Sequence, residues 1–300
     1  MIPIAPHGAN YIMSNDDGWA EINIRTLYQQ LRSYNERMSL MSQGSDNSMV
    51  VLSAPALNRS GTGSLNGTAK PVEHGCEFKS CSPGSPAIGF NSSDPHLNYV
   101  NSFPVTAVSY GILTLAPKFF GGPPDLAILG PNVGSNLDVQ IPFSGTVGSA
   151  VAATNLGVPA IAFHGRTGSH TAWNFRPVPR YPRLYAKYAV NIIATLTQSK
   201  KPYLPTGVWL NVNFPSVEPG KCNENNAKYV LSRIYPAIPV LDPPDVTTCG
   251  SNRLPLERTV VDTDGCYVSI SVGNKNKLDA NRDAQEAVLN RLSKILSCLP

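Results

Sequence analysis

The chain has 300 residues, 42% hydrophobic and 15% charged, and its 24 basic and 20 acidic side chains give a formal charge of +4. This composition is typical of a globular protein with a substantial core. So small a charge, without any Lys/Arg-rich run, argues against binding to duplex nucleic acid. No apolar run reaches about eighteen residues, so we expect no membrane-spanning helix and no membrane partner.

The stretch Tyr11–Ala20 indicates a short buried strand that ends on two adjacent carboxylates, Asp16 and Asp17. Gly18 permits a tight turn, and an amphipathic helix follows, because apolar residues recur at helical spacing: Ala20, Ile24, Leu27, Leu31 and Met38. Side chains at such a strand end lie in the crevice where open α/β sheets bind ligands. Two acids without Lys or Arg nearby favour a hard cation such as Mg²⁺, Mn²⁺ or Ca²⁺. The alternative is that they only turn the chain and cap the helix.

A second buried strand is predicted over residues 49–55, a β-rich run that ends at a proline. The loop 56–64 is rich in hydroxyls and glycine, which can bring backbone N–H groups close to an anion but is also common in flexible connections. It contains no dinucleotide-binding fingerprint, and the chain has no Walker sequence. Residues 66–102 carry many Gly, Pro, Ser and Asn, and we expect a long surface excursion closed by Cys76 and Cys81.

A helix is predicted over residues 104–115, with proline at its start, and a third buried strand over 125–130. The segment Phe143–Thr146 then opens a helix of small residues over 147–156. The N-terminus of such a helix presents unpaired N–H groups and the positive end of its dipole, which suits phosphate. The alternative is an ordinary Ser/Thr N-cap.

Further elements follow in the same alternation: a strand over 158–163, a helix over 185–196 and a strand over 208–215. We therefore predict an α/β fold, with a Rossmann-like, mostly parallel sheet sandwiched by helices.

The pattern changes beyond residue 220, so we expect a catalytic core over 1–220 and a C-terminal extension over 221–300. Strands are predicted over 229–234, 258–262 and 266–272, and the last of these alternates like a half-exposed antiparallel strand. A final helix has one apolar face. This extension is interpreted as a β-hairpin and helix appendage that serves as a dimerisation arm, so the expected assembly is a homodimer.

Six cysteines and three glycosylation sequons indicate an oxidising, secretory environment. The cysteines are Cys76, Cys81, Cys222, Cys249, Cys266 and Cys298, and the sequons begin at Asn58, Asn66 and Asn91. Residues 1–10 show no signal peptide, so we interpret the chain as a mature secreted form with an added initiator Met. The pairing of the four later cysteines is left open.

Four segments in this order resemble the SurE family of survival-protein phosphatases: Ser14–Gly18, Ala54–Gly61, Gly130–Asn136 and Phe143–Gly148. The resemblance covers residues 10–165, about half of the chain. The Asn-Asp-Asp-Gly sequence alone is a weak signal, but all four segments at these separations are highly specific. The Trp19-Ala20 continuation and the cysteine-bearing C-terminal part look most like a secreted fungal branch of acid phosphatases.

The resemblance implies a single divalent cation, Mg²⁺ or Mn²⁺, with Ca²⁺ a further candidate in crystals. Its implied ligands are Asp16, Asp17, Ser60 and Asn132. The implied phosphate-binding residues are Asn15, Ser144, Gly145 and Thr146, with Asn136 as a polar neighbour of the site. The catalytic residues would be Asp16, Asp17 and Asn132.

The implied activity is metal-dependent hydrolysis of phosphate monoesters such as nucleoside monophosphates, by a metal-activated water. A rival mechanism makes Asp16 or Asp17 a nucleophile that forms an aspartyl phosphate. The alternative function is a nucleotide- or phosphosugar-binding protein without turnover. No general acid is evident, and His164, just past the predicted strand 158–163, is the histidine that we would test for that role.

Overall fold

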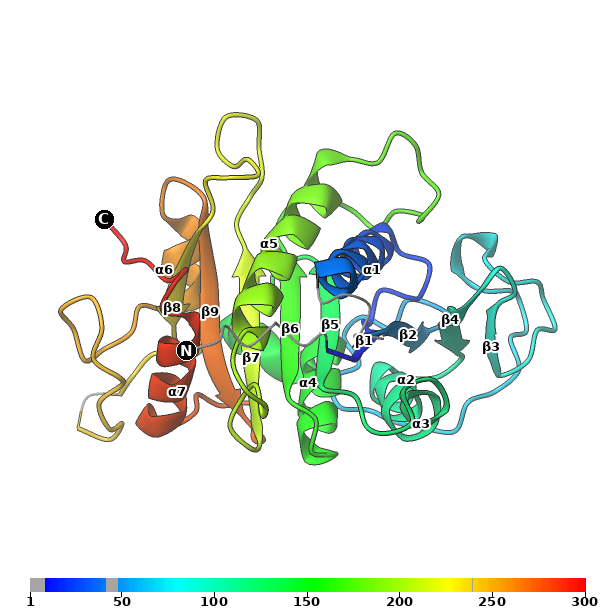
Figure 1. Cartoon of the computed structure of the whole chain (residues 1–300), viewed down its shortest axis with the longest axis horizontal. Helices are drawn as coiled ribbons and strands as arrows, with labels where there is room; N and C mark the ends of the chain where they lie inside the picture. Colours follow the sequence, from blue (N-terminus) through cyan, green and yellow to red (C-terminus); the bar gives the residue numbers. More distant parts are fainter. Residues whose placement is uncertain (1–8, 42–47, 239) are drawn as a thin grey trace.

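The computed structural model describes residues 9–41, 48–238 and 240–300, and within these ranges it forms one nine-stranded sheet covered by helices on both faces (Figure 1). The strand order is β3-β4-β2-β1-β5-β6-β7-β9-β8. The strands are β1 (Tyr11–Ser14), β2 (Val50–Pro55), β3 (Ile88–Asn91), β4 (Asp94–Val100), β5 (Leu126–Val133), β6 (Ala160–Gly165), β7 (Val208–Phe214), β8 (Lys228–Ser232) and β9 (Tyr267–Asn274). The six strands from β4 to β7 in this order run parallel, which confirms the predicted α/β fold class.

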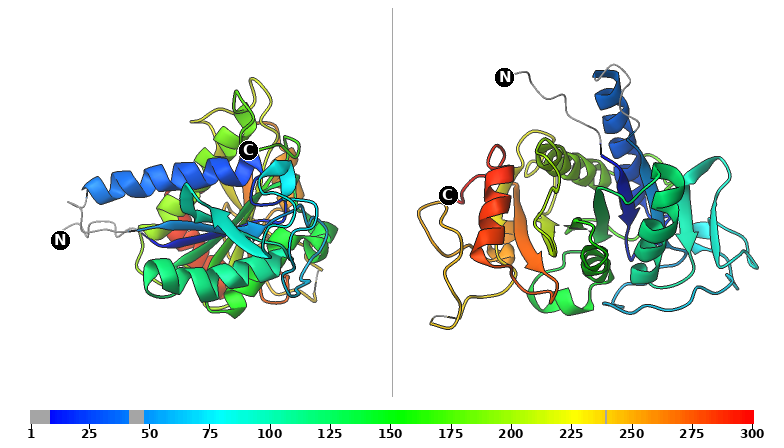
Figure 2. Two further views of the ribbon diagram at one scale, coloured as in Figure 1. Left: turned by 90° about the vertical axis from the view of Figure 1, so that its right-hand side faces the viewer. Right: turned by 60° about the horizontal axis from the view of Figure 1, so that its bottom comes forward.

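The helices form a layer on each face of the sheet. On one face lie α1 (Ile22–Met41), α5 (Arg180–Thr197) and α7 (Arg282–Leu292), and on the other lie α2 (Pro104–Tyr110), α3 (Ala116–Phe120), α4 (Gly145–Asn155) and α6 (Glu257–Asp262). The end-on view in Figure 2 shows the strands between α1 and the α2–α3 pair. Each central strand is therefore buried on both sides, which explains the nearly continuous apolar runs.

The expected surface excursion over residues 66–102 was only partly right, because it contains two strands. β4 continues the main sheet beside β2, with Leu52 opposite Leu97, and β3 pairs antiparallel at its outer edge. Leu97, Tyr99 and Val100 are buried. The first half of β4 is polar, so its sequence does not have the apolar pattern of a buried strand. Its second half is buried because it packs beside β2, which is distant in the chain. The predicted Cys76–Cys81 disulfide is present.

The strand predicted over 258–262 is wrong, since these residues belong to helix α6. Three consecutive β-branched residues favoured a strand, but Glu257, Val260 and Val261 are the buried positions, and their spacing is helical. Packing against the sheet thus decided the local structure. No helix in the described part of the chain is both long and apolar enough to cross a membrane.

The C-terminal strands differ in detail from the expected hairpin. β9 is antiparallel to β7, as predicted, but it pairs parallel with β8, and its two faces are buried rather than half exposed. Both strands extend the main sheet, and the division of the chain at residue 220 stays a prediction. The four later cysteines form the pairs Cys222–Cys266 and Cys249–Cys298.

Candidate functional site

Asp16 and Asp17 lie directly beyond the carboxyl end of β1, in the middle of the sheet. The chain leaves β1 toward β2 on one side, and the later strands are added from β5 on the other. Such a reversal of strand order opens a crevice at the carboxyl ends of the strands. Both carboxylates are only 2% exposed. Asp16 and Asp17 therefore lie in the crevice at the carboxyl ends of the strands, where we expected them from the sequence.

Asp16 is held by the N-terminus of α4. Thr146 donates its hydroxyl to Asp16 Oδ1 (2.6 Å) and Gly145 donates its N–H to Asp16 Oδ2 (3.1 Å). Ser144 caps the same helix by accepting the N–H of Val147 (3.0 Å). A Cβ on Gly145 would lie 2.8 Å from that of Asp16, so only glycine allows this approach. Three of the four residues expected to bind phosphate, Ser144, Gly145 and Thr146, thus lie at this helix N-terminus, where Gly145 and Thr146 hydrogen-bond Asp16.

Asp17 is held by the carboxyl end of β5, which extends beyond the strand predicted over 125–130 and includes Asn132 and Val133. Val133 donates its N–H to Asp17 Oδ2 (2.7 Å). The preceding residue, Asn132, donates its amide N–H groups to the carbonyls of Val133 (3.1 Å) and Gly134 (2.7 Å). Because these bonds fix the amide nitrogen, the oxygen of Asn132 keeps its capacity as a ligand, and no hydrogen bond within the described residues uses it. Asn132 is brought to the carboxylate pair, as predicted.

The loop after β2 closes the third side of the site. Arg59 donates its backbone N–H to the backbone carbonyl of Asp16 (2.6 Å), which brings the loop that contains Ser60 against the segment that carries the carboxylates. The Ser60 hydroxyl donates to Asn58 Oδ1 (2.7 Å) and is exposed. Asn15 is used differently from the prediction, because its side chain bonds both the N–H and the carbonyl of Gly18 and so shapes the turn.

The electrostatics of this arrangement favour a cation. Burial raises the pKa of Asp16, and burial together with repulsion from Asp16 raises the pKa of Asp17 well above its usual value. No Lys or Arg among the described residues forms an ion pair with either carboxylate. The described ranges also hold no group of three or more His, Cys, Asp or Glu that could bind a metal. A cation bound by Asp16 and Asp17 would therefore take its other protein ligands from amide and hydroxyl oxygens. Two unneutralised carboxylates with neighbouring neutral oxygens fit a hard divalent ion.

His164 lies in a closed polar network. Its ring nitrogens contact Asn136 (2.7 Å) and Asn211 (3.0 Å), the residue is fully buried, and burial lowers its pKa to about 3. A neutral imidazole with both nitrogens occupied does not supply a proton to a substrate, so His164 has a structural role. Asn136 belongs to the same network through its backbone bonds to Asn213.

His170 is a site residue that the sequence did not indicate. Its Nε2 lies 2.7 Å from the carbonyl of Asp17 and 3.2 Å from Glu77 Oε1, and the hydrogen bond with Glu77 raises its pKa to about 9. The three residues are far apart in the chain, and neither Glu77 nor His170 stands in a recognisable motif, so no signal in the sequence links them to Asp17.

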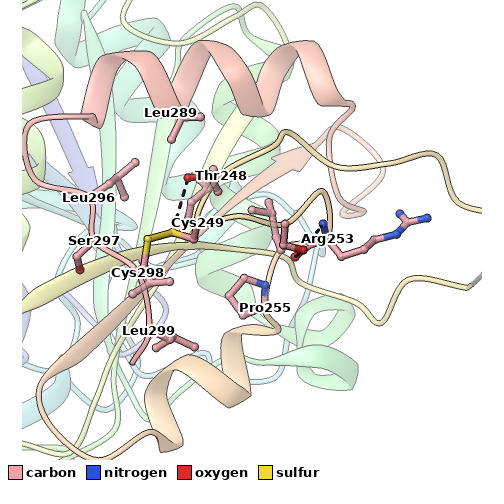
Figure 3. Close-up of a pocket in the computed structure, with 13 residues that line it drawn as sticks. Thr248, Cys249, Arg253, Pro255, Leu289, Leu296, Ser297, Cys298 and Leu299 are labelled. Atoms are coloured by element: carbon pink, nitrogen blue, oxygen red, sulfur yellow. Dashed lines mark hydrogen bonds between the residues drawn. A yellow bond between two sulfur atoms is a disulfide. The ribbon is translucent and has the colours of Figure 1, made fainter.

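An apolar cavity of about 280 Å³ lies at the other end of the sheet, between the loop 248–255 and the C-terminal residues (Figure 3). The disulfide Cys249–Cys298 forms part of its wall, together with Leu289, Leu296 and Leu299. Among the described residues, no carboxylate lines this cavity.

The chain is similar to known proteins over most of its length. The family model described as "Survival protein SurE" matches residues 11–235. The chain is 33% identical over 297 residues to the acid phosphatase of Yarrowia lipolytica (strain CLIB 122 / E 150), covering 87% of this chain and 78% of that protein. It is 29% identical over 213 residues to 5'-nucleotidase SurE of Lawsonia intracellularis (strain PHE/MN1-00), covering 69% of this chain and 66% of that protein.

A solved structure shows the same fold. The SurE protein from Aquifex aeolicus superposes with a TM-score of 0.57 at 21% identity, covering 94% of this chain and 98% of that one.

Proposed function

The chain belongs to the survival protein SurE family, and from this premise we propose that it is a divalent-metal-dependent phosphomonoesterase of the acid phosphatase or nucleotidase type. One observation supports this most directly: two buried carboxylates, Asp16 and Asp17, meet the N-terminus of α4, the loop after β2 and the end of β5, and no Lys or Arg among the described residues forms an ion pair with either. A binding protein without turnover has no need to keep two adjacent unneutralised acids.

The metal ligands in this proposal are Asp16, Asp17, Ser60 and Asn132, and the ion is Mg²⁺ or Mn²⁺. A divalent cation at this place supplies positive charge for the phosphoryl oxygens and lowers the pKa of water, which assists hydrolysis of the ester. The protein contributes orientation. Thr146 and Gly145 fix Asp16, and Val133 fixes Asp17, so the carboxylates need little rearrangement when the site is loaded.

The N-terminus of α4 supports binding of the phosphate. Ser144, Gly145 and Thr146 lie at the positive end of an eleven-residue helix, beside the carboxylates. Backbone N–H groups at such a terminus favour an anion, and a phosphoryl group next to the cation would lie within their field.

Hydrolysis of p-nitrophenyl phosphate and AMP tests this function. We expect activity with added Mg²⁺ or Mn²⁺, its loss with EDTA, and a fall of about a hundredfold or more in Asp16→Asn, equal to about 2.7 kcal/mol of transition-state stabilisation. The exposed Asp264→Asn is a matched control and should retain wild-type rates. Metal-dependent AMP binding in calorimetry without any phosphate release would instead favour the non-catalytic alternative.

We also propose that the protein is secreted and forms a homodimer. All six cysteines are paired, which suits an oxidising compartment.

Two apolar side chains of the Pro-rich segment after β8, Ile238 and Leu241, are 55% and 76% exposed, as expected for a dimerisation arm. Light scattering coupled to size exclusion gives the assembly, and a monomeric mass would exclude the dimer.

A further inference from the structure

A cavity of about 390 Å³ with both polar and apolar lining residues lies at the β2–β4 end of the sheet. Figure 1 shows this end of the sheet on the right. The cavity wall comes from three segments: residues 57–59 after β2, residues 68–75, and residues 101–103 after β4. The disulfide Cys76–Cys81 and the backbone pairing of Val72 with Ser85 hold the middle segment in place. The cavity is therefore a formed feature of the fold.

The cavity adjoins the proposed reaction site directly. Arg59, in its wall, donates its backbone N–H to the carbonyl of Asp16 (2.6 Å). On the opposite side the wall residue Phe103 precedes Pro104, whose Cγ would lie 3.1 Å from a Cβ on Gly145. A phosphate ester bound at Asp16 and Gly145 would have this cavity available for its alcohol part.

The charge of the cavity is positive and incompletely neutralised. Arg59 is half buried, its Nε is buried without a hydrogen-bond partner, and no carboxylate among the described residues pairs with its guanidinium. By contrast, the buried Arg233 lies 3.0 Å from Asp245. Lys70 also lines the cavity. The one carboxylate in the described lining, that of Glu73, has a side chain that is 85% exposed and lies 3.9 Å from His74, so it does not neutralise Arg59. An unpaired, partly buried cation is costly, and an anionic ligand removes that cost.

The cavity also offers a buried acceptor. The amide nitrogen of Asn101 donates to the carbonyls of Lys70 (2.8 Å) and Pro71 (3.1 Å), whereas its Oδ1 is buried without a partner. Solvent does not reach this oxygen in the structure, so a ligand hydroxyl would satisfy it only after a local movement of the wall. An unpaired cation and an unpaired acceptor in one cavity match a hydroxylated molecule that carries an anionic group.

We propose that this cavity binds the alcohol part of the substrate, and that the preferred substrates are hydroxylated phosphate monoesters with a second anionic group, of the sugar or nucleoside bisphosphate class. The inference rests on the proposed phosphomonoesterase function. Arg59 would bind the second anion, Asn101 would accept a hydroxyl, and Lys70 would add to the local field.

The test compares adenosine 3′,5′-bisphosphate with AMP as substrates, with metal in excess and products separated by chromatography. The measured quantity is the ratio of the two kcat/KM values for release of the 5′-phosphate, in which effects common to both substrates cancel. We expect the wild type to favour the bisphosphate, and Arg59→Met to lower the ratio about tenfold or more, as for loss of a charged hydrogen bond. Arg183→Met, on the exposed side of α5, is the matched control and should leave the ratio unchanged.

Two further variants keep the test decisive. Arg59→Lys should recover part of the ratio, because it retains the charge but not the planar fork of donors. If Arg59→Met does not fold, the exposed Lys70→Met should still lower the ratio by a few fold. A wild-type ratio near one, or a ratio unchanged in Arg59→Met, would overturn the inference. If p-nitrophenyl phosphate is not hydrolysed, the proposed function is refuted instead. The dissociation constants of the bisphosphate and of AMP, measured by calorimetry, would then test the cavity, and equal constants would overturn the inference.

Discussion

Replacing Thr146 by valine removes the hydroxyl that orients Asp16 while it preserves the shape of the side chain. In the native protein this hydroxyl lies 2.6 Å from Asp16 Oδ1, and both residues are buried. A hydrogen bond to a charged group contributes roughly 1.5–3 kcal/mol. The N–H of Gly145 still reaches the other oxygen of Asp16, at 3.1 Å. We therefore expect Thr146→Val to lower the free energy of unfolding by about 2 kcal/mol, which corresponds to a fall in Tm of about 3 °C for a chain of 300 residues.

Activity should fall together with stability, because a misoriented ligand weakens the metal site. Loss of an outer partner of a metal ligand typically reduces metal affinity or activity about 10–100-fold. Thermal unfolding with and without Mn²⁺ and kcat/KM for AMP measure the two effects. Thr146→Ser is the control, since it keeps the hydroxyl and should remain close to wild type. If the valine and serine variants behave alike in both assays, the hydroxyl does not orient Asp16 and the reasoning is refuted.

Three other predictions follow from buried groups. Burial raises the pKa of Glu257 well above its usual 4.5, although the Asn211 amide that donates to its Oε1 (2.8 Å) acts in the opposite direction, so the folded protein keeps this proton while the unfolded chain releases it. The free energy of unfolding of the wild type, measured in urea, should therefore decline relative to that of Glu257→Gln as the pH rises from about 5 to 8, by at most about 1.4 kcal/mol per pH unit, and a constant difference would refute the assignment. Gly148→Ala would place a Cβ 2.0 Å from the carbonyl of Gly63, so we expect a loss of about 1–3 kcal/mol in urea unfolding and lower activity, whereas an unchanged midpoint would contradict this tight packing. A divalent cation at 100 times its Kd should stabilise the wild type by about 2.7 kcal/mol, and calorimetry should show no such gain after EDTA or in Asp17→Asn.

The order of the elements around the site was predictable from local pattern. A buried apolar run that ends on a polar loop marks the carboxyl end of a parallel strand, and such ends meet at one edge of the sheet. We therefore expected Asp16 and Asp17 after the first strand and Asn132 in the loop beyond the strand predicted over 125–130. In the structure Asn132 lies near the end of β5, and the neighbouring Val133 hydrogen-bonds Asp17. The alternation of buried strands with amphipathic helices also predicted the mostly parallel sheet.

Local pattern was insufficient where distant packing determines the conformation. Residues 258–262 have the composition of a strand and form a helix, and the polar start of β4 conceals a strand of the main sheet. The pairing of Cys222 with Cys266 was equally open, because residues 44 apart in the chain can be joined only by the fold.

The sequence by itself determined which oxygen-bearing side chains lie at the ends of the central strands, because that depends on short-range hydrophobic patterning. Only the tertiary structure decided their partners. The hydroxyl of Thr146 reaches Asp16 across 130 positions of the chain. Likewise, the guanidinium of Arg59 has no carboxylate partner among the described residues because of how three separate segments pack around it. Contacts of this range depend on the geometry of the assembled sheet, which no local stretch of sequence encodes.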